Sequence, residues 1–238
     1  MDRLTRKELK QDKFAQEVGQ TVEFLGEHKQ QVIRYGAIAL AVILVAVGWL
    51  YFSRHQKAAR QKELAAAMEL INAPVGLPAL YGPEAYPSAA DKDKAIVKAF
   101  TELAVKSAGS EEARIARYFL GTKAAEQGNF DEAVKHLTDA ASGNSPYASL
   151  AKLALAEVYG SQNKIADAEK ILKGLIEKPS ALVSKEQATL ALARLLASSR
   201  PDEARRLLEP LRAAPGPVGR AAVAALESVA ANTLNTGS

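Results

Sequence analysis

Residues 118–140, YFLGTKAAEQGNFDEAVKHLTDA, recur in altered form 35 positions later as residues 153–175, LALAEVYGSQNKIADAEKILKGL. In this alignment Ala133 matches Ala168, and the leucines four positions further on also coincide. Apolar residues spaced three and four apart mark one face of an α-helix, so each copy predicts two helices joined by a short turn. Self-similarity at this spacing is the signature of a stack of repeated structural units. The stretch therefore predicts an all-α repeat architecture.

A third and more divergent copy occupies residues 190–211, LALARLLASSRPDEARRLLEPL. Its opening LALA repeats the start of the second copy at an offset of 37, whereas Ala204 lies 36 positions after Ala168. The turn between its two helices has therefore lost one residue. Three aligned copies favour a repeat array over an ordinary helical bundle.

Small and special residues give each copy a physical logic. Gly121 and Ala156 on the first helices let the second helices approach closely, and three aligned alanines do the same on the second helices: Ala133, Ala168 and Ala204. Gly128 and Asn163 supply the left-handed conformation that ends a helix. Pro201 is expected to begin the second helix of the third copy. Three other prolines are expected to close the second helices: Pro146, Pro179 and Pro215.

These positions resemble the tetratricopeptide repeat, a helix pair with a Leu-Gly pair, then Gly, then Ala, then a large apolar residue, and then Ala and Pro. The resemblance implies an α-solenoid of about three to four helix pairs whose first helices line a concave, partner-binding groove. Carried onto this sequence, it assigns six groove residues: Tyr118, Thr122, Leu153, Glu157, Leu190 and Arg194. Such a surface suits an amphipathic or extended peptide. The alternative is that Leu153 and Leu190 simply pack between repeats.

Residues 35–53, YGAIALAVILVAVGWLYFS, contain no charged residue and lie between Arg34 and Arg54. As a helix they extend about 28 Å, close to the thickness of a bilayer's hydrocarbon core. Apolar residues surround this helix, and aromatic residues mark both of its ends, as they do at membrane interfaces. The alternatives are a buried core helix and a cleavable signal peptide, whose apolar region is shorter. We expect a single transmembrane helix.

The chain divides into five expected segments: a charged tail (1–34), the transmembrane helix (35–53), an atypical first repeat (54–110), three tetratricopeptide-like repeats (111–215), and a capping helix with a frayed end (216–238). The membrane helix is expected to continue to Asn72 as the first helix of the domain. Its partner is expected over residues 91–107. Between them, the prolines and glycines of residues 73–90 predict an irregular loop, which either has a binding role or is pinned to the helices.

The charged tail carries seven Lys/Arg and six Asp/Glu. Four apolar residues form a narrow stripe at helical spacing, typical of a surface-bound or solvated helix: Phe14, Val18, Val22 and Leu25. Charges close to the membrane helix favour a cytoplasmic C-terminal domain, because four basic residues follow the helix and two precede it. A short basic tail before an uncleaved anchor favours the opposite orientation, with the N-terminus in the cytoplasm. We expect the second arrangement.

No pattern in the sequence predicts catalysis, a cofactor or a metal. The chain has no cysteine, which excludes disulfides and thiolate metal sites. Its three histidines lie in separate segments: His28, His55 and His136. Phosphate-binding loops and hydrolase or metalloprotease motifs are absent from the sequence. The net charge of +4 is spread out, which argues against a nucleic-acid-binding face. We therefore expect a protein that is not an enzyme and has no small-molecule substrate.

The layout as a whole (basic tail, one span, a helix continuing into the domain, and degenerate repeats) resembles the YfgM-type ancillary subunit of the bacterial Sec translocon. This resemblance implies a single-pass protein of the bacterial inner membrane with a periplasmic repeat domain. Implied partners are the translocon, periplasmic chaperones and exported chains. The alternatives are a structural subunit of an envelope complex and a cytoplasm-facing membrane scaffold.

Overall fold

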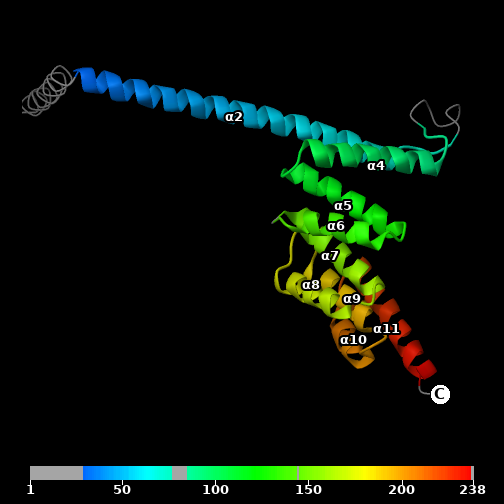
Figure 1. Ribbon diagram of the computed structural model, residues 1–238. Coiled ribbons are helices and arrows are strands. Elements are labelled where there is room, and N and C mark those ends of the chain that lie inside the picture. Colours follow the sequence, from blue (N-terminus) through cyan, green and yellow to red (C-terminus); the bar gives the residue numbers. More distant parts are fainter. Residues whose placement is uncertain (1–28, 77–84, 144, 237–238) are drawn as a thin grey trace, which may run out of the picture. The chain divides into compact units, whose positions relative to one another are not determined.

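The computed structural model describes residues 29–76, 85–143 and 145–236, and these residues are almost entirely helical (Figure 1). In chain order the elements are α2 (Lys29–Asn72), α4 (Ala89–Lys106), α5 (Glu111–Glu126), α6 (Phe130–Ala141), α7 (Pro146–Ser161), α8 (Ile165–Glu177), α9 (Lys185–Leu196), α10 (Pro201–Leu208), the 3-10 helix η1 (Glu209–Ala213) and α11 (Pro217–Thr236). The predicted fold class, an all-α solenoid preceded by a long apolar helix, is confirmed.

The chain forms two compact units, one ending at Ala59 and the other beginning at Arg60. In the first unit, α2 carries the apolar segment predicted to span a membrane. Its window of highest hydropathy averages 2.2, and no residue of that window is buried. The side chains of Trp49, Leu44 and Ile38 are all exposed. The helix is therefore long and apolar enough to cross a bilayer. The predicted stripe of the tail lies outside the described residues.

The second unit begins with the last turns of α2, which pack against α4 and α5. Ala67 of α2, Phe100 of α4 and Leu120 of α5 share one hydrophobic core. The Phe100 ring stacks on Phe119 with centroids 4.9 Å apart. Helix α2 ends at Asn72 because Pro74 follows and cannot continue the helix. The last turns of α2 and helices α4 and α5 therefore share one packed core.

The segment between α2 and α4 is irregular where it is described, and residues 77–84 lie outside the described residues. Its two ends pair through an isolated bridge, in which the amide of Tyr86 donates to the carbonyl of Pro74 at 2.9 Å. The ammonium of Lys92 also donates to the carbonyl of Ala73 at 2.7 Å. Helix α4 starts two residues earlier than predicted, because the hydroxyl of Ser88 caps it by accepting the amide of Asp91.

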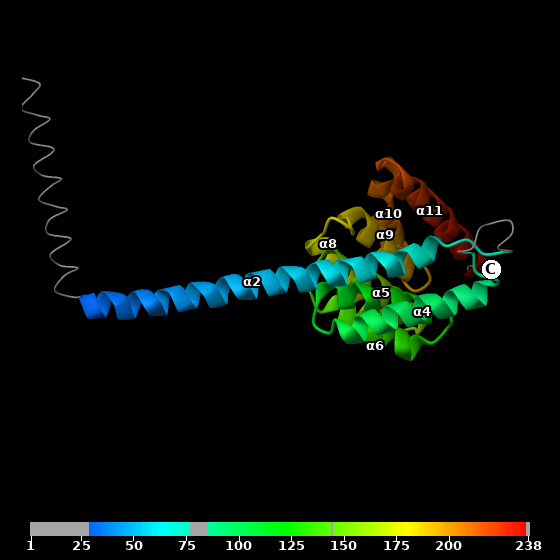
Figure 2. The same ribbon diagram turned by 90° about the horizontal axis from the view of Figure 1, so that it is seen from above.

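The three predicted repeats appear as the pairs α5–α6, α7–α8 and α9–α10. Each helix packs against the next, and the first helices α5, α7 and α9 also pack against one another in order. Figure 1 shows this stack as successive layers from α4 to α10, and Figure 2 shows it from above. This arrangement leaves the first helices together on one side of the array, as in a solenoid.

The turn residues behave largely as their types predict. Gly128 has φ of 77°, and Asn163 has φ of 59°, the one positive value at a non-glycine residue in the described ranges. Pro201 begins α10 as expected. The prediction for Pro146 was wrong: it does not close α6, which ends at Ala141, but occupies the first turn of α7. Its lack of an amide proton is harmless there, because the first helical amides have no partner in any case.

The C-terminal end of the array is covered by η1 and α11. Helix α10 spans only eight residues, and the chain then tightens into η1, which contains Pro210. Helix α11 packs against α9, α10 and η1, and it buries Ala222 and Val229 in the same core as Leu208 of α10. The last repeat of a solenoid needs such a cover, because its outer face has no following repeat.

Candidate partner-binding groove

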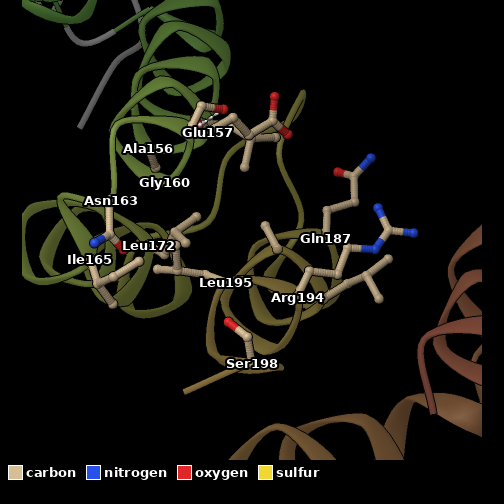
Figure 3. A pocket seen from close by; sticks show the side chains of 14 residues that line it. Ala156, Glu157, Gly160, Asn163, Ile165, Leu172, Gln187, Arg194, Leu195 and Ser198 are labelled. Atoms are coloured by element: carbon tan, nitrogen blue, oxygen red, sulfur yellow. Dashed lines mark hydrogen bonds between the residues drawn. The ribbon is translucent and has the colours of Figure 1, made fainter. Parts of the chain in front are cut away.

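A hollow of about 580 Å³ lies between the first helices α7 and α9. Apolar side chains form much of its lining, including Ile165 and Leu172 of α8 and Leu195 of α9. Its polar side chains come from opposite walls. In Figure 3, Glu157 projects from α7 on one side, and Gln187 and Arg194 project from α9 on the other. A concave site with an apolar lining and few polar groups is typical of ligand-binding surfaces.

Four of the six residues predicted to line the groove border this hollow: Leu153, Glu157, Leu190 and Arg194. The other two, Tyr118 and Thr122, lie on α5 and do not border it. The structure thus brings together the predicted residues of the second and third repeats. The predicted residues of the first repeat lie on α5, which packs against α7.

Gln187, Leu190 and Arg194 border the hollow because their spacing of three and four positions places them on one face of α9. Ser198, two residues after the end of α9, also borders the hollow. A capping box fixes where the helix begins: the Ser184 hydroxyl accepts the amide of Gln187, whose side chain in turn accepts the amide of Ser184. Extending the helical period from Leu190 and Arg194 would have found Gln187 and Ser198, which the repeat pattern alone did not assign.

The two leucines predicted for the groove also belong to the protein core. Leu190 is only 7% exposed and lies in the hydrophobic core of the C-terminal repeats. Leu153 is partly buried and packs against the same core. Both residues therefore pack between repeats while contributing to the lining of the hollow. The polar side chains of Glu157 and Arg194 are exposed, so a bound partner would meet them directly.

The electrostatics of the hollow are dominated by one acid and one base. The surrounding protein removes part of the water around the Glu157 carboxyl, and this raises its pKa above the ordinary value of 4.5. The positive charge of Arg194 acts in the opposite direction and lowers the same pKa. The loss of hydration is the larger influence. Glu157 therefore becomes protonated at a higher pH than a solvated glutamate does.

Tyr118, the predicted groove residue on α5, contacts another aromatic side chain. The ring of Tyr118 meets the ring of Tyr147, in the first turn of α7, edge to face with centroids 6.1 Å apart. Burial raises the pKa of Tyr118, and the nearby charge of Glu157 raises it further. The Thr122 hydroxyl donates to the backbone carbonyl of Phe119 at 3.0 Å, which satisfies it within its own helix. Tyr118 therefore lies within the electrostatic influence of Glu157, whereas the hydroxyl of Thr122 is bonded within its own helix.

A second hollow of about 390 Å³ continues the groove toward the cap. Arg194 borders both hollows, so its side chain stands between them. The far wall of the second hollow belongs to α11 and includes Ala225 and Ser228. The repeat pattern did not predict this contribution, because α11 lies outside the three aligned copies.

The structure describes the surroundings of two of the three histidines, His55 and His136. In the described ranges, no three side chains of His, Asp or Glu gather as a metal site would require. His55 is exposed on α2 and stacks with Tyr51, at 6.5 Å between centroids. His136 lies 3.6 Å from Glu132 on α6. His28 lies outside the described residues.

Comparison with known proteins supports the repeat architecture. Residues 124–180, from the end of α5 through α8, match the family described as Tetratricopeptide repeat. No curated protein and no solved structure matches the chain. The helix pairs on both sides of the matched stretch continue the same packing. The family match and the packed helix pairs together support a tetratricopeptide-repeat protein.

Proposed function

We propose that this chain is a membrane-anchored repeat protein that binds a segment of a partner protein in the groove formed by α5, α7 and α9. The observation that carries the proposal is the hollow between α7 and α9, which four of the six groove residues predicted from sequence border. Tetratricopeptide repeats mediate protein–protein interactions, and the apolar segment of α2 supplies an anchor. Anchoring keeps the groove close to partners that lie in or pass through the membrane.

We further propose that the anchor lies in a bacterial inner membrane, with the N-terminal tail in the cytoplasm and the repeats in the periplasm. In this setting the protein acts as an ancillary translocon subunit or a chaperone adaptor, and its partners are the Sec translocon, periplasmic chaperones or exported chains. The support is the order of the segments: a tail with seven basic residues, one apolar helix, and a repeat domain that follows directly.

Two other functions fit parts of the same observations. A structural subunit of an envelope complex would keep its groove permanently occupied. The burial of Leu190 fits this alternative, because it indicates a residue that packs between repeats. A cytoplasm-facing membrane scaffold fits the four basic residues between Arg54 and Lys62, on the C-terminal side of the apolar segment. A domain that is stable and monomeric without partners speaks against the first alternative.

Membrane topology is tested with a reporter enzyme that is active only outside the cytoplasm, fused after Ser238. External protease applied to spheroplasts provides the independent check. We expect an active reporter and a digestible repeat domain. An inactive reporter with a protected domain would overturn the periplasmic and translocon proposals, because the groove would then face cytosolic partners.

Partner binding is tested by placing a photo-crosslinking amino acid at Glu157, inside the groove. The matched control carries it at Glu177, an exposed acid on α8 that does not border this hollow. We expect crosslinks to a defined partner at Glu157 that are absent at Glu177. Equal crosslinking at both positions would mean that the groove is not the binding surface.

A further inference from the structure

The two walls of the α7–α9 hollow carry opposite charges. Glu157 stands on the α7 wall, beside the aromatic pair of Tyr118 and Tyr147. Arg194 and Gln187 stand on the α9 wall. Between the two walls lies an apolar lining. The groove is therefore polarised across its width and apolar in the middle.

In the part of the chain that the structure describes, neither charge has a direct partner. Within the described ranges, the side chains of Glu157 and Arg194 form no hydrogen bond and no ion pair within 4 Å. Other charged residues of the array are paired: Arg117 lies 3.0 Å from Asp139, and Lys123 lies 2.9 Å from Asp93. The charge of Arg194 influences the pKa of Glu157, although the two side chains do not form an ion pair. Both groups are thus available to a bound molecule.

A partner that covers the hollow removes water from both groups. Removing an unpaired charge from water is unfavourable unless the partner supplies an opposite charge or hydrogen bonds. The best occupant therefore has a cationic group facing Glu157 and an anionic group facing Arg194.

Resting on the proposed function, we infer that the groove selects a peptide segment in which a bulky apolar side chain stands between a basic and an acidic residue. The apolar side chain enters the hollow, the basic residue lies on the α5–α7 side, and the acidic residue lies on the α9 side. Complementary charges across an interface fix orientation and reject mismatched partners. The polarity of the groove therefore sets the direction in which the segment binds.

The test uses four synthetic, fluorescently labelled 13-residue peptides and the full chain in detergent micelles. The first peptide has a central leucine, lysines toward its N-terminus and glutamates toward its C-terminus. In the others, glutamine replaces the lysines, the glutamates, or both. Fluorescence anisotropy gives the affinity of each peptide. We expect the fully charged peptide to bind about tenfold more tightly than the neutral one.

Double-mutant cycles identify which wall of the hollow contacts the lysines of the peptide and which wall contacts its glutamates. Glu157→Gln should weaken binding of lysine-containing peptides about fivefold and leave peptides without lysine unaffected. Arg194→Gln should likewise weaken binding of glutamate-containing peptides about fivefold and leave peptides without glutamate unaffected. The matched controls are Glu177→Gln and Lys178→Gln, which change exposed charges outside this hollow and should have no effect. Circular dichroism verifies that each variant is folded.

The outcomes separate the inference from the proposed function. Ala191→Trp fills the hollow and should abolish binding of all four peptides. If all peptides bind equally well and Ala191→Trp abolishes binding, the groove binds segments but charge selection is wrong. If Glu157→Gln couples to the glutamates instead of the lysines, the inferred direction is wrong. If no peptide binds, or if Ala191→Trp has no effect, both the inference and the binding role of this hollow are overturned.

Discussion

Gly121 of α5 lies directly against Leu137 of α6: a methyl group added at position 121 would come within 2.6 Å of the Leu137 Cγ atom and 3.1 Å of its amide nitrogen. Leu137 is fully buried, so it has little freedom to move aside. The contact explains why the first repeat has glycine at this position. It also shows how closely the two helices of one pair approach.

We expect Gly121→Ala to destabilise the repeat domain by about 1–3 kcal/mol, because the added methyl group overpacks this contact. Thermal and denaturant unfolding of the full chain in micelles measure the effect. The matched control is Gly174→Ala on α8, where an added methyl group meets no atom within 4 Å. The control should be stabilising by about 0.4–1 kcal/mol, because alanine lowers the conformational entropy of the unfolded chain relative to glycine. Equal effects at both sites would contradict the close approach.

The turn residues Gly128 and Asn163 lead to a second prediction. Both have positive φ, at 77° and 59°. A residue with a Cβ atom is strained in this region by roughly 1–2 kcal/mol, and asparagine is among the few that tolerate it. Gly128→Ala should therefore be destabilising by about 1 kcal/mol, whereas Asn163→Gly should be nearly neutral. Denaturant unfolding measures both changes. A neutral Gly128→Ala substitution would show that the turn relaxes to another conformation.

These two sites show what the sequence was able to predict. Repetition of small residues and turn residues at a fixed offset predicts which helices pair and where each first helix ends, because those positions obey local steric rules. The position of Pro146 was predicted incorrectly, because a proline between two helices fits both the end of one and the first turn of the next. Only the structure decides between these two roles.

The groove was predictable in part for the same reason. Leu153, Glu157, Leu190 and Arg194 were found because they occupy equivalent places in aligned repeats. The contribution of α11 was not predictable, because this helix has no counterpart in the aligned copies and its docking depends on tertiary packing. The sequence also could not predict that Glu157 and Arg194 form no ion pair with each other, because sequence spacing does not give the distance between two charges on different helices.

Glu112 provides a third prediction. It is only 5% exposed, in the first turn of α5, and its carboxylate lies 3.5 Å from Nε of Arg60. Replacing Glu112 removes this ion pair and leaves its buried site unfilled. We expect Glu112→Ala to destabilise the domain by about 1–3 kcal/mol. The control is Glu111→Ala, which removes an exposed acid from the same first turn of α5. Both substitutions therefore remove the same favourable interaction with the helix dipole, and only Glu112→Ala also removes a buried ion pair. Chemical denaturation should show the larger loss for Glu112.

Glu169 gives a pH-dependent prediction. Its carboxylate accepts hydrogen bonds from Arg200, which precedes α10, and pairs with Lys173 of α8 at 2.7 Å. The Arg200 contact is the main cause that lowers the pKa of Glu169 below 4.5. An acid whose pKa is lowered by folding stabilises the protein above its unfolded pKa, and this contribution is lost as the pH falls through the folded pKa.

We therefore expect the wild-type chain to lose more stability than Glu169→Gln when the pH falls below 4.5, and the two to differ by a constant amount above it. Thermal unfolding from pH 3 to pH 7 tests this. The pair lies near the surface, so salt should reduce the difference. Parallel pH profiles of the two proteins across the acid range would show that the Arg200 contact contributes nothing.

The raised pKa of Glu157 leads to the last prediction, which concerns binding. Loss of hydration is the main cause that raises this pKa above 4.5, so Glu157 becomes neutral at a higher pH than a solvated glutamate. A basic residue of a bound segment favours the ionised form. Binding of the peptide that has lysines but glutamine in place of the glutamates should therefore weaken as the pH falls through the raised pKa, beginning above pH 4.5. The peptide with glutamine in place of both the lysines and the glutamates should show little change there, because it has no cation to face Glu157. Glu157→Gln should make the two pH profiles parallel. A loss of binding that persists in this variant would assign the titration to a group other than Glu157.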